Sequence, residues 1–143
     1  MKPPNILFIV MDTARARTVL GDEDVMPNVR RIANEGTLFS RAFATGPWTL
    51  PSHASMFTGQ YTSDHTTYAG SKTFEPDVPP VAELLNNAGY QTVAISNNVW
   101  ISPEFGFDRG FEDFKTGMEL LQSETDLISV AKDTNGIVEQ LRA

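Results

Sequence analysis

The sequence predicts an α/β fold with a mostly parallel β-sheet, and three observations support this prediction. A continuous apolar run, Ile6–Met11, ends at Asp12. Unbroken apolarity of this length is typical of a strand covered on both faces. A second strand is predicted over Tyr90–Ile95. Helical and extended segments alternate between them, and this rhythm favours parallel strands joined by right-handed crossovers.

The connecting segments carry their own start and stop signals. Pro27–Glu35 is predicted as a helix with one apolar face, ended by Gly36, and residues 37–44 are predicted to be extended. Val81–Ala88 is predicted as a second helix, ended by Gly89.

Polar and glycine-rich stretches are predicted to be loops. Gln60–Pro80 is rich in Thr, Ser, Gly and Pro, and Phe105–Phe111 mixes aromatic residues with glycine. Met118–Ala143 is predicted to be helical, although its amphipathic pattern is weak.

Composition limits the classes of function. The 143 residues suffice for about one domain with a real core, and the chain contains no cysteine. The net charge of −7 argues against nucleic acid as a partner, because phosphate binding needs clustered Lys and Arg. No apolar run reaches the length of a membrane span, and the N-terminus is a poor signal peptide. We therefore expect a cytoplasmic protein; the sequence does not indicate its oligomeric state.

The segment Thr49–Gly59 is the most informative part of the chain. Pro51 suits the first position of a helix and Gly59 suits the position just after its end. A helix start carries partial positive charge and attracts anions, so a hydroxyl there would face a phosphate or sulfate group. The alternative is an ordinary helix start capped by Thr49 or Ser52.

Three polar segments follow predicted strands or lie in neighbouring loops. They are Asp12, the loop at Thr49, and Ser96–Asn98. Because ligands bind beyond the carboxyl ends of parallel strands, these segments are expected to converge on one site.

Four stretches, taken in order, resemble the sulfatase family within the alkaline phosphatase superfamily. They are Asn5–Asp12; Met26–Asn28 with Asn34–Gly36; Thr49–Gly59 with His65 beyond it; and Gly106–Phe111. The resemblance implies a three-layer α/β sandwich of the alkaline phosphatase type. It also implies that residues 1–143 are the N-terminal portion of a longer catalytic domain.

The resemblance assigns roles to two residues. Asp12 matches the metal-binding aspartate of the family, and Thr49 matches its nucleophile and metal ligand. Sulfatases place Cys or Ser at this position, followed by x-Pro-x-Arg, and convert it to formylglycine. Thr49 and His53 look more like nucleotide pyrophosphatase/phosphodiesterases, which use an unmodified threonine. We therefore expect divalent metal ions (Zn, Mn, Ca or Mg) and no formylglycine.

Other polar residues have a functional and a structural interpretation. His53 is expected to orient Thr49 or touch the anion. Asn97 and Asn98 are expected to donate to a non-bridging oxygen of the substrate, and the alternative is that they are turn residues. His65 and Arg109 are interpreted as structural: a loop hydrogen-bonder and an anchor between aromatic residues.

The expected function is metal-dependent hydrolysis of small anionic esters, with phosphate esters favoured over sulfate esters. A true sulfuric ester hydrolase is the first alternative, and a non-catalytic module that keeps the anion pocket for binding or assembly is the second. The family takes further metal ligands from downstream regions, and no histidine follows His65 here. We therefore expect the isolated chain to turn over esters slowly or not at all.

Overall fold

The computed structural model describes residues 3–21 and 25–122 and divides into two compact units. The N-terminal unit is Met1–Ala44 and the C-terminal unit begins at Thr45. Within the described residues, no helix is long and apolar enough to cross a membrane.

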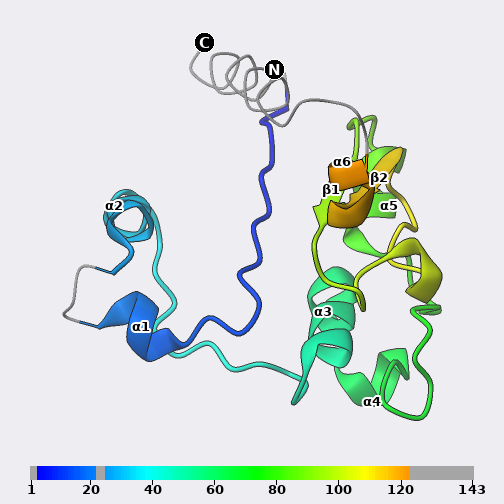
Figure 1. Cartoon of the computed structure of the whole chain (residues 1–143), viewed down its shortest axis with the longest axis horizontal. Helices are drawn as coiled ribbons and strands as arrows, with labels where there is room; N and C mark the ends of the chain where they lie inside the picture. The colour runs from blue at the N-terminus through cyan, green and yellow to red at the C-terminus, as the bar shows by residue number, and fades with distance from the viewer. Residues whose placement is uncertain (1–2, 22–24, 123–143) are drawn as a thin grey trace. The chain divides into compact units, whose positions relative to one another are not determined.

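The N-terminal unit contains two short helices, α1 (Ala16–Leu20) and α2 (Pro27–Glu35) (Figure 1). The bounds of α2 confirm the predicted helix, with proline at its start and Gly36 after its end. The guanidinium of Arg30 donates to the carbonyl of Gly21 over 2.5 Å, which ties α2 to the residue that follows α1.

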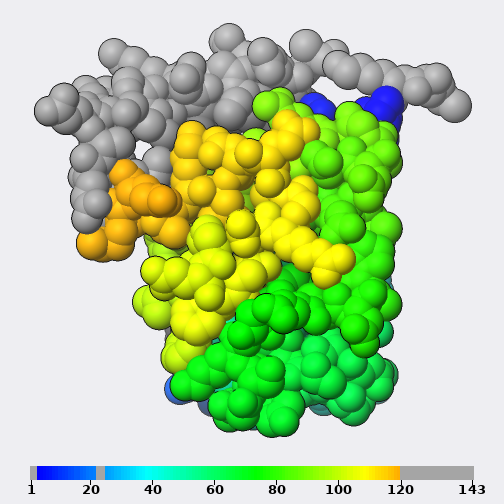
Figure 2. All heavy atoms as spheres, turned by 90° about the vertical axis from the view of Figure 1, so that its right-hand side faces the viewer, coloured from blue at the N-terminus to red at the C-terminus, as the bar shows by residue number. Residues whose placement is uncertain are grey.

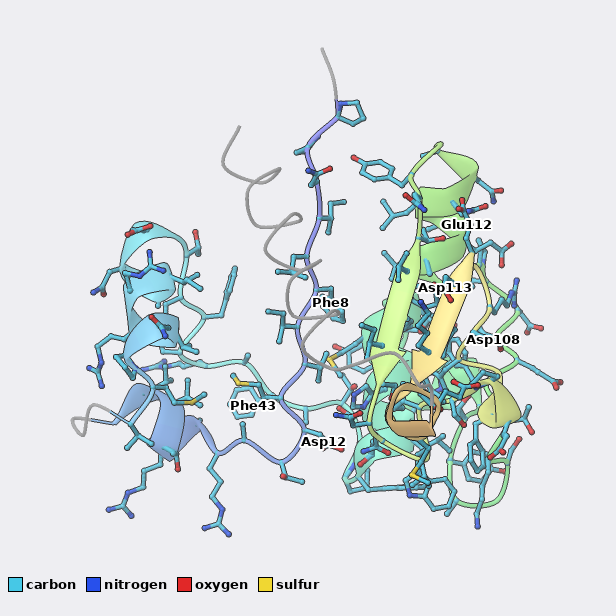
Figure 3. All side chains as sticks on the ribbon, turned by 45° about the horizontal axis from the view of Figure 1, so that its top comes forward. Phe8, Asp12, Phe43, Asp108, Glu112 and Asp113 are labelled. Carbon is cyan, nitrogen blue, oxygen red and sulfur yellow. The ribbon has the colours of Figure 1, made fainter. Side chains whose placement is uncertain are left out.

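The predicted first strand is wrong for this structure. Residues 6–11 are irregular chain, and their apolar side chains are 39–75% exposed. A strand needs a neighbour for its N–H and C=O groups, and the only strand ladder in the described residues joins two other segments. Phe43, in the segment predicted to be extended, is 88% exposed (Figure 3). Residues 37–44 are irregular as well.

The C-terminal unit begins with α3 (Thr49–Thr58), the helix predicted from the most informative segment. Gly59 follows it with φ 71°, and its N–H donates to the Ser55 carbonyl, as the stop signal predicted. The predicted start differs by two residues, because Thr49 opens the helix and Pro51 is its third residue. Trp48 is the N-cap residue and its side chain makes no cap hydrogen bond, so the N-cap position is held by neither Thr49 nor Ser52, as the alternative interpretation had it.

The polar segment after α3 is more ordered than a plain loop. It contains the short helix α4 (Thr62–His65) and a backbone bridge between Tyr68 and Ser71. The predicted helix after it is confirmed as α5 (Val81–Asn87), which is capped by Ala88.

The sheet of the C-terminal unit has two parallel strands, β1 (Val93–Ser96) and β2 (Asp113–Thr116). The parallel pairing confirms the α/β class, whereas a three-layer sandwich is not seen in the described residues. β2 was not predicted; between the strands lies a 3₁₀ turn, η1 (Pro103–Phe105). After β2 comes α6 (Gly117–Gln122), and the rest of the predicted C-terminal helix lies outside the described residues.

The core of the C-terminal unit joins α3 to the segment before β1 and to the segment between the two strands. It consists of Leu50 and Ala54 of α3, Phe74 from the segment before β1, and Ile101 and Phe107 from the segment between the two strands, none of them more than 6% exposed. The rings of Phe74 and Phe107 stack with centroids 4.4 Å apart. The N–H of Phe74 donates to the Phe105 carbonyl over 2.7 Å, so the green and yellow segments of Figure 2 lie against one another. This core fixes the position of α3.

Candidate functional site

Thr49 is the first residue of α3 and is half-buried. The next two residues, Leu50 and Pro51, are buried in the unit. Gly46 lies so close to this turn that a Cβ on it would come within 2.9 Å of Pro51 and of the Ser52 nitrogen. The first turn contains no acidic side chain, so its partial positive charge is not neutralised locally.

His53 lies one turn further along α3 and is 7% exposed. Its Nδ1 is 2.8 Å from the backbone carbonyl oxygen of Thr49. Because a carbonyl can only accept, Nδ1 carries the proton and donates, and Nε2 is left as an acceptor in the neutral ring. His53 therefore contacts the backbone of Thr49 through Nδ1, and this bond holds the imidazole against the helix start.

His65 is a buried hydrogen-bonding residue, as its structural interpretation predicted. The Thr67 N–H donates to its Nδ1 over 3.1 Å, so Nε2–H of the neutral ring donates to Ser55 Oγ over 2.9 Å. Burial lowers the pKa of His65 below its ordinary value of 6.5. This neutral histidine fastens α4 to α3.

The two asparagines follow β1 directly, as predicted. Asn98 Oδ1 accepts from the Trp100 N–H over 3.0 Å, which is the geometry of a turn residue. Asn97 is exposed, and its side-chain oxygen lies against Gly117, the first residue of α6, directly after the neighbouring strand β2. The Asn98 bond supports the turn interpretation for that residue; donation by either residue to a substrate stays a prediction.

The start of α3 and the segment after β1 are brought together. Trp48 precedes Thr49, Trp100 follows Asn98 by two residues, and their ring centroids are 5.2 Å apart in an edge-to-face pair. Two of the three polar segments expected to converge therefore lie side by side within the C-terminal unit.

Asp12 belongs to the N-terminal unit and is exposed (Figure 3). It lies in a turn in which the Ala14 N–H donates to the Met11 carbonyl over 3.2 Å, and Thr13 has φ 62°. Among the described residues, no group of three His, Cys, Asp or Glu side chains is placed to hold a metal ion.

A family model described as Sulfatase matches residues 4–129. The match covers most of the chain, so the chain belongs to the sulfatase family, within the alkaline phosphatase superfamily. The predicted family is thereby confirmed.

Several curated relatives are also sulfatases. The chain is 36% identical over 110 residues to an N-acetylglucosamine-6-O-sulfatase of Bacteroides thetaiotaomicron, a match that covers 75% of this chain and 20% of the relative. It is 29% identical over 114 residues to an ulvan-active sulfatase of Formosa agariphila (76% and 23%). It is 31% identical over 136 residues to an N-acetylgalactosamine-6-sulfatase of Sus scrofa (77% and 25%).

The chain thus matches only about a fifth to a quarter of the length of these relatives. No solved structure is significantly similar to it.

These relatives correct the expected cofactors. They belong to the sulfatases that depend on formylglycine and a calcium ion, so the expectation of an open choice among Zn, Mn, Ca and Mg, with no formylglycine, is wrong. That expectation rested on two residues, Thr49 and His53, whereas the family relationship rests on a match over residues 4–129.

The described residues fit this cofactor set only in part. Calcium takes about six to eight oxygen ligands, and the Asp12 carboxylate is a suitable one. At position 49, which the resemblance aligned with the nucleophile, the chain has threonine and not the Cys or Ser expected of a sulfatase. The described residues do not by themselves make a complete calcium site or a formylglycine precursor.

Trp48 and Trp100, which bring the two polar segments together, were not among the predicted site residues. Trp48 and Trp100 are the only tryptophans of the chain, and each lies within two residues of a predicted site residue. This closeness in the sequence was the signal that could have identified them as neighbours of the site.

Proposed function

We propose that this protein is a sulfuric ester hydrolase whose reacting centre is residue 49, at the start of α3. The single observation that carries this proposal is the match to the sulfatase family over residues 4–129, which includes α3. The chain spans about a fifth to a quarter of the curated relatives, so the activity of the whole protein is part of the proposal.

The local geometry supports a role in binding a sulfate group. The start of α3 carries partial positive charge without an acidic neighbour in its first turn, and a sulfate monoester carries one negative charge. Leu50 and Pro51 are buried behind Thr49, so the helix start is held rigidly by the core. A fixed helix start favours a single orientation of the bound anion.

His53 is proposed to assist at the same position. Its Nδ1–H is used by the Thr49 carbonyl, and this bond fixes the ring with Nε2 as its remaining polar atom. Asp12 is proposed as a calcium ligand, because its carboxylate offers the hard oxygen that this ion prefers.

Sulfated sugars are the proposed substrates. Two of the relatives are named for the 6-sulfates of N-acetylglucosamine and N-acetylgalactosamine. A phosphate diester is the second candidate, and the observation that favours it is Thr49 with His53 in place of the Cys or Ser and Arg of the sulfatase motif.

A substrate panel tests the proposal. The whole protein, to which the proposed activity belongs, is assayed with calcium, and again after EDTA treatment, on N-acetylglucosamine 6-sulfate, 4-nitrophenyl sulfate, 4-nitrophenyl phosphate and bis(4-nitrophenyl) phosphate. We expect hydrolysis of the sulfate esters that EDTA abolishes. Hydrolysis of the phosphate esters alone would overturn the proposal in favour of the second candidate. Binding of sulfate esters without hydrolysis of any ester would overturn it in favour of a non-catalytic module.

A further inference from the structure

Two tryptophans and one lysine form a cluster beside the start of α3. The Trp48 and Trp100 rings meet edge to face at 86°, and the Nζ of Lys72 lies 5.2 Å from the centroid of the Trp100 ring. Both tryptophans are only half-buried, and Lys72 is exposed. The cluster therefore presents aromatic surface and a positive charge next to the proposed reacting centre.

The cluster is held in place from several directions. Trp48 is the N-cap of α3, so its backbone is fixed directly before Thr49. The backbone N–H of Trp100 donates to Asn98 Oδ1, and its ring packs on Phe105 with centroids 5.0 Å apart. These contacts give both aromatic rings a defined orientation before any ligand binds.

Lys72 is also anchored through its backbone neighbours. The residue before it, Ser71, exchanges two backbone hydrogen bonds of 3.0 Å with Tyr68. Two residues after it, Phe74 is 1% exposed in the core. The ammonium group is therefore carried on a short, fixed piece of chain.

Ion pairing distinguishes Lys72 from the other lysine and the arginine within residues 45–122. Lys115 lies 3.0 Å from a carboxylate oxygen of Asp113, and Arg109 lies 2.6 Å from one of Glu83. Within residues 45–122, Lys72 forms no such ion pair and rests on the Trp100 ring instead. In a chain of net charge −7, it is a cation that is not neutralised by a neighbouring carboxylate.

Aromatic side chains and a cation together recognise a particular kind of ligand. Tryptophan offers a large apolar surface at low entropic cost, against which the C–H face of a sugar ring can pack. An ammonium group beside it attracts an anionic substituent on the same ring. A sulfated sugar with only one negative charge would use that charge at the start of α3, so the lysine suits a second one.

We propose that Trp48, Trp100 and Lys72 form a subsite that binds the sugar ring of the substrate and selects rings that carry a second negative charge. This inference rests on the proposed function for the location of the first sulfate. It adds the class of substrate: a sugar sulfate with a further anionic group, rather than a neutral sugar monosulfate.

Tryptophan fluorescence tests the subsite directly, because both tryptophans of the chain belong to it. The protein is titrated with N-acetylglucosamine 6-sulfate and with N-sulfoglucosamine 6-sulfate, which differ by one negative charge. We expect both sugars to change the emission, with about fivefold tighter binding of the doubly charged one, as for one partly exposed charge pair. Absence of any change in emission would overturn the proposal.

Two lysine variants isolate the charge. Lys72→Gln should remove the preference for the doubly charged sugar and leave the affinity for the singly charged sugar within about twofold. Lys115→Gln is the matched control, because it removes an exposed lysine of the same unit that is already paired. Retention of the full preference in Lys72→Gln, or its loss in Lys115→Gln, would overturn the role of Lys72.

Hydrolysis of 4-methylumbelliferyl sulfate separates this inference from the proposed function. If the protein binds the doubly charged sugar more tightly but hydrolyses no sulfate ester, the result would support the subsite and contradict the proposed function. Hydrolysis of this ester, together with an unchanged binding preference in Lys72→Gln, would support the proposed function and contradict the subsite.

Discussion

Removing the Phe107 ring should weaken the C-terminal unit more than most single substitutions. Phe107 is fully buried, stacks on Phe74 and meets Phe57 edge to face with centroids 5.7 Å apart. Truncation to alanine leaves a cavity in the core that also holds Leu50 and Ala54 of α3. The expected loss is about 3–5 kcal/mol of unfolding free energy.

Urea unfolding followed by tryptophan emission measures this loss, because Trp48 and Trp100 pack against the same core. With an m-value of about 2 kcal/mol per molar urea, the midpoint should fall by about 2 M. Phe107→Leu keeps most of the volume and should cost about 1–2 kcal/mol, so a transition remains measurable if the alanine variant does not fold.

Phe43→Ala is the matched control for this prediction. Phe43 is 88% exposed, so its removal should change the unfolding free energy by no more than about 0.5 kcal/mol. Equal shifts of the midpoint for Phe107→Ala and Phe43→Ala would refute the assignment of the core.

Three further substitutions test local features. Gly110→Ala should destabilise the protein far more than Gly89→Ala. Both glycines have a positive φ (89° at Gly110 and 87° at Gly89), but only at Gly110 would a Cβ collide with the backbone at Glu83. Gly89→Ala should therefore cost only the about 1–2 kcal/mol that the positive φ imposes, and equal losses in urea unfolding would contradict this. Burial lowers the pKa of His65, so the unfolded chain binds the extra proton, and stability should be highest above pH 6.5 and fall as the pH drops from there through the lowered pKa. His65→Gln should flatten the unfolding free energy in that window, and an unchanged slope would show that another group is responsible. Arg109→Lys should cost about 1 kcal/mol in the same assay, because lysine cannot bond the Glu83 carboxylate and the Pro76 carbonyl in the fork geometry of arginine; no change would show that these bonds contribute little.

Helices with clear end signals were the most predictable part of the fold. α2 has proline at its start and glycine after its end, and the predicted bounds agree with those observed. The end of α3 was predicted because Gly59 has a positive φ that few other residues adopt. These signals are local, so a single sequence contains them in full.

Strand pairing was less predictable, because it depends on distant partners. The apolar run at residues 6–11 reads as a buried strand but is exposed in the described structure. β2 was missed because Asp113–Thr116 is only four residues long and two of its residues are charged, so its alternating pattern is too short to indicate a strand. Its partner β1 lies 20 residues away in register, Val93 opposite Asp113, which no local pattern reveals.

The sequence predicted which segments form the candidate site better than it predicted the side-chain contacts within it. Thr49 and the Asn97–Asn98 loop were expected to converge, and the Trp48–Trp100 pair brings their segments together. The sequence indicated neither the His53–Thr49 backbone bond nor the position of Lys72 over Trp100, because both depend on how side chains pack. The expected cofactors were wrong because the differences from the sulfatase motif at Thr49 and His53 were given more weight than the other sulfatase-like motifs along the chain.

The rate of sulfate ester hydrolysis in Thr49→Ala tests directly whether residue 49 is the reacting centre. The protein and the variant are compared on N-acetylglucosamine 6-sulfate, with Met56→Ala, an exposed position on the same helix, as the control for changes in α3. We expect a loss in kcat/KM of about a thousandfold or more for Thr49→Ala, with the unfolding midpoint preserved, and little change for Met56→Ala. A folded Thr49→Ala variant that keeps a tenth or more of the activity, as an order-of-magnitude limit, would contradict residue 49 as the reacting centre.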